Sequence, residues 1–175
     1  EFFLFRDSYA EAQDKGHRGL VPISAYNEDY HIFQTTKEEE VMRAIRNGLQ
    51  GADVPVENSK GEAEAGQEEI NVRYAEALTM ADRHAIIKNA CKEIAWSQGR
   101  AVSFMAKWNT QAAGSSCHLH QSLSSLDGKP LFHDAAAEHG MSDLMRHYLA
   151  GLLHHADEIT YFLAPYVNSY KRFMA

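Results

Sequence analysis

The sequence predicts an α+β fold in which one mainly antiparallel, curved sheet is backed by long helices. Residues 69–74 alternate polar and apolar side chains, as in a strand that is buried on one face. Residues 75–98 carry apolar side chains at the spacing of one helical face, namely Ile87, Cys91, Ile94 and Ala95. Gly99 follows, where the left-handed conformation that ends many helices is expected. Strands in succession with long helices between them are typical of this fold class.

Further strands are expected at residues 1–5, 100–107 and 117–122. After the last of them, Asp127-Gly128 predicts a tight hairpin turn. Residues 51–66 are rich in Gly, Glu and Ala and contain a proline, so an active loop is expected there rather than a regular element.

Two further helices are indicated by the residues at their starts. Thr36 offers a hydroxyl cap, and the glutamates at 38–40 would face the positive end of the helix dipole. This helix is expected to end near Gly48. Ser142 is expected to cap one long helix that continues through Leu163.

The composition limits the function classes. The 175 residues suffice for one domain with a sizeable core, and a net charge of −7 argues against nucleic-acid or anionic-membrane partners. No apolar run reaches the roughly 18 residues of a membrane span, and no signal peptide is visible. Two cysteines in different settings imply no disulfide framework, so a reducing cytoplasm is the expected location.

Both ends of the chain look cut. The sequence opens directly on the strand-like residues 1–5 without a starting methionine, and it stops at residues 171–175 without a closing cap or polar tail. We therefore expect a fragment, or the ordered part of something larger.

Two segments carry residues suited to chemistry. As a strand, residues 117–122 would place His118, His120 and Ser122 on one face. Glu62 and Glu69 flank an Ala-Gly pair, so a tight turn could bring both carboxylates to one ion, and hard divalent cations prefer such oxygen ligands.

Each segment also has a plainer interpretation. The histidines could be surface or structural residues, and Glu62, Glu64, Glu68 and Glu69 could form a solvated acidic loop. Together, the carboxylates and histidines favour a divalent cation in a phosphate-handling enzyme.

Four segments, in order, resemble motifs of the glutamine synthetase family. Residues 62–74, with a Glu-x-x-x-Gly-Gln-x-Glu-Ile core, resemble its metal-binding loop, and residues 114–123 resemble its strand for metal, glutamate and ATP. Residues 168–172 match its glutamate-binding Asn-Ser-Tyr-Lys-Arg motif. Residues 1–5 resemble the strand that supplies metal-binding glutamates. The four motifs span essentially the whole chain.

The resemblance implies a site with ATP and two divalent ions, Mg²⁺ or Mn²⁺. It assigns the first ion to Glu1, Glu62 and Glu69, and the second ion, which bridges the ATP phosphates, to His118. It further implies roles in binding glutamate or ATP for the following residues: backbone of Gly114 and side chain of Arg172 for glutamate, His120 and Ser122 for ATP, Glu57 near the ribose and Tyr74 near the nucleotide.

Alternatives remain for two of these residues. Taken alone, Tyr74 is expected to pack on the apolar face of its strand, and Arg172 could pair with a surface acid.

The implied reaction is ATP-dependent ligation of glutamate with ammonia or an organic amine through γ-glutamyl phosphate. The family usually has an Asp-Asn pair where this chain has Ala112-Ala113, and the segments 59–62 and 104–107 are more similar to the branch that ligates glutamate to organic amines. The rival interpretations are a non-catalytic sensor or structural relative and an unrelated metal-dependent hydrolase that uses no ATP.

The resemblance also implies that residues 1–175 are a partial catalytic domain. The family's N-terminal β domain and its C-terminal ATP and arginine segment would lie outside them. We therefore expect this chain alone to be weakly active or inactive, and the full-length protein to be a homo-oligomer.

Overall fold

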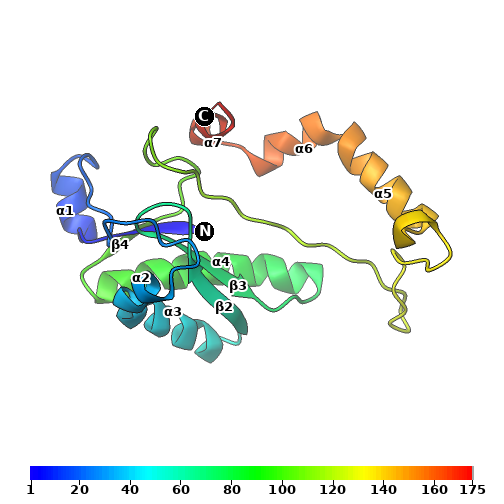
Figure 1. Ribbon diagram of the computed structural model, residues 1–175, viewed down its shortest axis with the longest axis horizontal. Coiled ribbons are helices and arrows are strands. Elements are labelled where there is room, and N and C mark those ends of the chain that lie inside the picture. Colours follow the sequence, from blue (N-terminus) through cyan, green and yellow to red (C-terminus); the bar gives the residue numbers. More distant parts are fainter. Residues whose placement is uncertain (175) are drawn as a thin grey trace. The chain divides into compact units, whose positions relative to one another are not determined.

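The structure is a computed structural model that describes residues 1–174. These residues form two units, Glu1–Ser116 and Cys117–Met174, which are described separately below (Figure 1). None of the helices in the described part combines the length and apolar character that a membrane span requires.

The first unit contains a four-stranded sheet. Its strands are β1 (Phe2–Phe5), β2 (Val56–Gly61), β3 (Gln67–Val72) and β4 (Ala101–Ser103). They lie in the order β2-β3-β1-β4, and every neighbouring pair is antiparallel. Together with the helices, this sheet confirms the α+β prediction.

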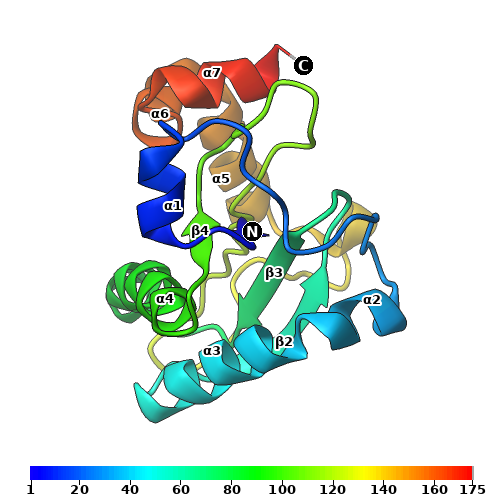
Figure 2. The ribbon, with the colours of Figure 1, turned by 90° about the vertical axis from the view of Figure 1, so that its left-hand side faces the viewer.

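The helices of the first unit are α1 (Tyr9–Asp14), α2 (Ile32–Lys37), α3 (Glu39–Gly51) and α4 (Ala77–Ser97). Figure 2 shows the paired strands β2 and β3 together with α3 and α4. The Glu76 side chain caps α4 by accepting hydrogen bonds from the backbone N–H groups of Leu78 and Thr79. Gly99 follows with a φ of +67°, as the helix-stop pattern predicted.

Strand β1 is buried on both faces. Phe2 and Leu4 belong to the main core with Ile45 and Leu49 of α3 and Cys91 of α4. On the other face, Phe3 and Phe5 form a second core cluster with Ala112, against which Leu20 and Trp108 pack. Successive side chains of a strand point to opposite faces, so the uninterrupted Phe-Phe-Leu-Phe run reflects a strand covered on both sides.

Three predictions for this unit need correction. Thr36 does not begin a helix: it lies inside α2, where its hydroxyl donates to the carbonyl of Ile32 at 2.8 Å. The helix that carries the glutamates instead begins at Glu39, with Glu38 as its N-cap. Residues 51–66 are not all loop, because β2 pairs there with β3. The strand expected at 100–107 is limited to β4.

The second unit contains a 3₁₀ turn, Glu138–Gly140, and helices α5 (Asp143–His154), α6 (Ala156–Leu163) and α7 (Val167–Phe173). Ser142 caps α5 as predicted, since its hydroxyl accepts from the Met145 N–H at 3.1 Å. The single long helix was wrong: His155 ends α5 and precedes α6.

The strand predicted at 117–122 was also wrong. These residues pair with no strand in the described chain, and the only pairing near them is an isolated bridge between Ser124 and Pro130. The tight turn was correct: Gly128 adopts a φ of +83° and its N–H donates to the carbonyl of Ser125.

Three glutamates of the first unit are buried: Glu28, Glu38 and Glu68. Burial and the charge of Glu28 raise the pKa of Glu68 to about 10, so Glu68 is neutral at pH 7. Burial and the same neighbouring charge raise the pKa of Glu38 to about 7, although Lys37, Arg6 and Arg100 oppose the shift. A buried carboxyl cluster of this kind is more stable when partly protonated.

We predict that Glu38→Gln stabilises the protein in a pH-dependent way. The folded pKa of Glu38, about 7, lies above the unfolded value of 4.5. The stability that its protonation contributes is therefore complete below pH 4.5 and is lost as the pH rises through 7. A neutral glutamine avoids that loss, so the variant should gain about 3 kcal/mol at pH 8 and nothing near pH 4.5.

Thermal unfolding between pH 4.5 and 8 measures this difference. Glu40→Gln, at an exposed carboxyl in the first turn of the same helix, is the matched control. A Glu38→Gln variant that tracks the control at every pH would contradict the prediction.

Candidate metal centre

Three carboxylates meet on the first unit: Glu1, Glu62 and Glu69. One oxygen of each lies within 4.8 Å of the other two, and all three residues are half-buried. They come from three places in the chain, since Glu1 precedes β1, Glu62 follows β2 and Glu69 lies within β3. This is the cluster that the family resemblance assigned to the first divalent ion.

The register of the sheet explains why they meet. In the β1–β3 pair, Phe2 lies opposite Glu68 and Phe3 opposite Gln67, so the next position of the same register sets Glu1 beside Glu69. On its other side, β3 places Glu69 opposite Lys60 of β2. Directly opposed residues of antiparallel strands share a face. Glu69 is therefore flanked on one face by an acid and a base.

Adjacent residues of β3 face opposite ways. Glu68 lies opposite Phe2, whose ring belongs to the core beneath α3 and α4, and it is fully buried. Glu69 lies on the other face, where its side chain is 14% exposed. The interpretation of Glu62, Glu64, Glu68 and Glu69 as a solvated acidic loop is therefore wrong for Glu68, and Glu62 is also largely covered, with 17% exposed.

Hydrogen bonds orient the three carboxylates. Ser116 donates its backbone N–H to one oxygen of Glu1 and its hydroxyl to the other, each at 2.7 Å. Glu69 accepts from the Asn71 amide at 2.6 Å. The Lys60 ammonium donates to Glu62 and lies 3.1 Å from Glu69.

The electrostatics of the cluster shift the pKa values of Glu62 and Glu69 in opposite directions. Burial raises the pKa of Glu62, and the adjacent Glu69 raises it further. Burial opposes the charge of Glu69 too, but hydrogen bonds from Glu62, Asn71 and Lys60 outweigh it and lower its pKa. Burial likewise opposes the charge of Lys60, whose pKa is raised by its hydrogen bonds to the two acids. Two close carboxylates repel one another unless a proton or a cation lies between them.

The turn between β2 and β3 holds Glu62 in place. Gly66 adopts a φ of +72°, and a Cβ there would lie 2.9 Å from the carbonyl oxygen of Leu4, so only glycine fits. Its N–H donates to the buried Glu28 at 3.0 Å. The backbone N–H of Glu62 donates to the carbonyl of Gln67 at 2.7 Å, which closes the turn.

Gln67 connects this turn to the predicted glutamate-binding backbone. Its fully buried amide donates to the carbonyl of Gly114 at 3.1 Å and to the Ser115 hydroxyl at 3.3 Å. Glu64 accepts from the Ala113 N–H at 3.1 Å. The segment that contains Gly114 is thus fixed against the carboxylate cluster.

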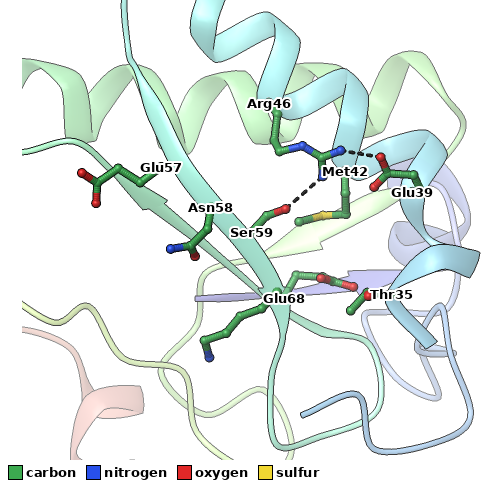
Figure 3. Close-up of a pocket in the computed structure, with 9 residues that line it drawn as sticks. Thr35, Glu39, Met42, Arg46, Glu57, Asn58, Ser59 and Glu68 are labelled. Carbon is green, nitrogen blue, oxygen red and sulfur yellow. Dashed lines mark hydrogen bonds and ion pairs between the residues drawn. The ribbon is translucent and has the colours of Figure 1, made fainter. Parts of the chain in front are cut away.

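A cavity of about 380 Å³ lies between α3 and β2 (Figure 3). Arg46 crosses it and donates to Glu39 and, at 2.9 Å, to the Ser59 hydroxyl. Glu57, the residue predicted to lie near the ribose, lines this cavity and is outside the carboxylate cluster. Tyr74 is 82% exposed, so the expectation that it packs on the apolar face of its strand was wrong.

The remaining predicted site residues lie in the second unit. His118, His120 and Ser122 are exposed on an irregular segment, so strand alternation does not place them on one face. Arg172 lies in α7 and is half-buried, and its Nε atom is buried without an acceptor in the described chain.

Sequence reasoning did not identify three residues that support the centre: Lys60, Gln67 and Ser116. The spacing of Lys60 was a usable signal. Residues two positions apart in a strand point to the same face, so once β2 is recognised as a strand, Lys60 is expected on the face of Glu62 and of its cross-strand partner Glu69. Nothing local marked Gln67 or Ser116, since their partners are distant in sequence.

The donor set suits a divalent cation. Three half-buried carboxylates offer the hard oxygen ligands that Mg²⁺ and Mn²⁺ prefer, and a Lys60 ammonium already contacts two of them. A cation is thus the kind of group that suits this cluster.

Comparisons with known proteins identify the family of this chain. The family model described as the glutamine synthetase catalytic domain matches residues 1–175. The gamma-glutamylethanolamide synthetase GlnA4 of Streptomyces coelicolor is 48% identical over 99% of this chain, and the glutamate–isopropylamine ligase of a Pseudomonas species is 34% identical over 98%. The chain spans 37% and 38% of the lengths of these two relatives.

Solved structures give the same result. One described as "Apo GmaS without ligand" superimposes with a TM-score of 0.85 at 31% identity, covering 98% of this chain and 39% of that one. Another, described as "GmaS/ADP complex-Conformation 1", gives a TM-score of 0.84 at 31% identity over 98% of this chain and 38% of that one. The chain therefore belongs to the glutamine synthetase family, whose catalytic-domain model it matches, and resembles the branch that joins glutamate to amines.

Proposed function

We propose that this chain is the central part of the catalytic domain of an ATP-dependent ligase that joins glutamate to ammonia or an organic amine. The observation that carries the proposal is the cluster of Glu1, Glu62 and Glu69, which is assembled from three separate places in the chain and suits a divalent cation. Membership of the glutamine synthetase family supports the reaction class.

In this proposal, Glu1, Glu62 and Glu69 hold the first Mg²⁺ or Mn²⁺, and His118 contributes to holding a second. These ions would neutralise the negative charge of the ATP phosphates. Ser116 contributes by fixing both oxygens of Glu1. The protein thus presents carboxylates whose orientation is set before any ligand arrives.

The reaction has two displacements. A side-chain carboxylate oxygen of glutamate attacks the γ-phosphorus of ATP, the bond to the β-phosphate oxygen breaks, and ADP leaves with γ-glutamyl phosphate formed. The amine nitrogen then attacks the acyl carbon, phosphate leaves, and the nitrogen loses a proton. Positioning two anionic reactants in line is the main demand on the protein.

Several contacts support the substrate assignments. The Arg172 Nε–H is buried without an acceptor in residues 1–174, which suits a donor for the glutamate carboxylate. Gln67 holds the Gly114 backbone proposed to position the same substrate. For ATP, we propose His120 and Ser122 as contacts, with Glu57 near the ribose and Tyr74 near the nucleotide. The ADP complex of a similar structure supports a nucleotide site.

We propose an organic amine rather than ammonia as the acceptor. The two curated relatives described above are named for ethanolamide synthesis and for isopropylamine ligation. The substitution of Ala112-Ala113 for the family's usual Asp-Asn pair favours the same branch. Ala112 is buried as a member of the second core cluster, so this substitution changes the packing of the segment leading to Gly114.

The rival functions lack a specific supporting feature. A sensor or structural relative would not need the three carboxylates, which are retained together with His118 and Arg172. A metal-dependent hydrolase would use the carboxylates but would need neither ATP nor glutamate, and membership of the glutamine synthetase family therefore gives it no support.

We further propose that residues 1–175 are part of a longer catalytic domain whose full-length protein is a cytoplasmic homo-oligomer. The short span of the chain relative to its relatives supports the first point. Both cysteines are free, Cys91 buried and Cys117 exposed, which is compatible with a reducing compartment.

We predict that Glu69→Gln in the complete protein weakens Mn²⁺ binding at least tenfold and lowers ligase activity at least a hundredfold. The amide keeps the shape of the side chain but removes a charged ligand. Calorimetric titration with Mn²⁺ and a coupled assay of ADP release measure the two effects. Glu40→Gln, which removes an exposed charge, is the control; equal effects of the two variants would contradict the metal assignment.

We predict that ADP release by the complete protein requires both glutamate and an amine, and that at least one small alkylamine, polyamine or amino alcohol exceeds ammonia in kcat/KM by tenfold or more. A panel of amines at constant glutamate and ATP tests this. Preference for ammonia would contradict the amine assignment alone, and ADP release that needs no amine would contradict the ligase reaction.

A further inference from the structure

Lys60 lies where a cation would bind the carboxylate cluster. Its ammonium donates a hydrogen bond to Glu62 and lies 3.1 Å from an oxygen of Glu69. It also lies 5.0 Å from the centre of the Tyr30 ring. The side chain is 25% exposed. Two of the three carboxylates proposed as metal ligands are therefore partners of an internal positive charge.

The position of Lys60 follows from the sheet and is not an accident of a flexible surface side chain. Its backbone is paired with Glu69 in the β2–β3 register, and Gly61, the next residue, packs so closely that a Cβ there would lie 2.8 Å from the carbonyl oxygen of Glu28. The ammonium is thus held on the face of the sheet that carries the carboxylates.

A divalent ion and this ammonium cannot both use these oxygens favourably. Two cations within a few ångströms repel one another, and in a half-buried site the repulsion is screened less than in water. An ion bound to Glu62 and Glu69 would have to displace the ammonium or bind against its charge. Either event weakens binding of the ion.

We propose that Lys60 is an internal counter-ion that competes with the first divalent ion for Glu62 and Glu69. In the absence of the ion it offsets the repulsion among the three acids and stabilises the fold. In its presence the ammonium must leave at least one carboxylate, which limits the affinity for the ion. This inference rests on the proposed function, because it assumes that Glu1, Glu62 and Glu69 are ligands.

The test is a Mn²⁺ titration by calorimetry of the complete protein, without ATP, for the wild type, Lys60→Met and Lys60→Arg. Lys60→Met should bind Mn²⁺ about tenfold more tightly, which corresponds to about 1.4 kcal/mol. Lys60→Arg keeps the charge and should remain within threefold of the wild type. Unchanged or weaker binding by Lys60→Met would overturn the proposal, because weaker binding would mean that Lys60 positions the ligands.

Thermal unfolding gives a second readout. In EDTA, Lys60→Met should melt below the wild type, because the carboxylates lose their counter-ion, and saturating Mn²⁺ should raise its melting temperature by more than that of the wild type. An equal rise in both would overturn the proposal. Should Lys60→Met fail to fold, Lys60→Gln carries the same expectation with a polar side chain of similar length.

Two controls separate this inference from the proposed function. Lys15 forms an ion pair with the buried Asp7 in the same unit, so Lys15→Met tests whether loss of any such pair alters Mn²⁺ affinity; it should not. Glu69→Gln should weaken binding in the wild-type background. Weakening by Glu69→Gln without tightening by Lys60→Met rejects the counter-ion alone, whereas no Mn²⁺ binding by any variant rejects both the counter-ion and the metal centre.

Discussion

The pairing of β3 with strands on both sides is the constraint on which the carboxylate cluster depends. Strand β3 lies between β1 and β2, and its antiparallel register sets Glu69 beside Lys60 on one side and next to Glu1 on the other. A shift of that register by one residue would turn Glu69 toward the helices and Glu68 toward the cluster. The buried core beneath Phe2 and Leu4 opposes such a shift, because it would expose apolar side chains.

Electrostatics gives the cluster a second constraint. Three half-buried carboxylates within 4.8 Å would repel one another, and the structure offsets this with donors from Ser116, Asn71 and Lys60. On the opposite face, Glu68 is accommodated differently, since its pKa of about 10 leaves it neutral at pH 7. Neighbouring residues of one strand therefore meet opposite requirements: Glu69 keeps its charge and Glu68 does not.

The segments that connect the strands complete the candidate site. Gly66 permits the close turn that brings Glu62 back beside Glu69, and Gln67 holds the segment of Gly114 and Ser115 against it. Gly66 and Gln67 are each required because a segment distant in sequence lies against them. Leu4 lies against Gly66, and Gly114 and Ser115 accept hydrogen bonds from Gln67. These close contacts fix the backbone around the residues that are proposed to bind ligands.

The sequence by itself determined the fold class, the apolar face of α4, the cap of α5 at Ser142 and the family motifs, because these depend on spacings of a few residues. It also indicated Glu62 and Glu69 as candidate ligands. The resemblance to the family added Glu1 to them. Only the tertiary structure showed how strand register brings Glu1 beside Glu69, that Lys60 contacts two of the three acids and that Glu68 is buried, because register links residues distant in the chain. It also replaced a predicted strand at 117–122 with an irregular segment, since alternation alone supplies no pairing partner.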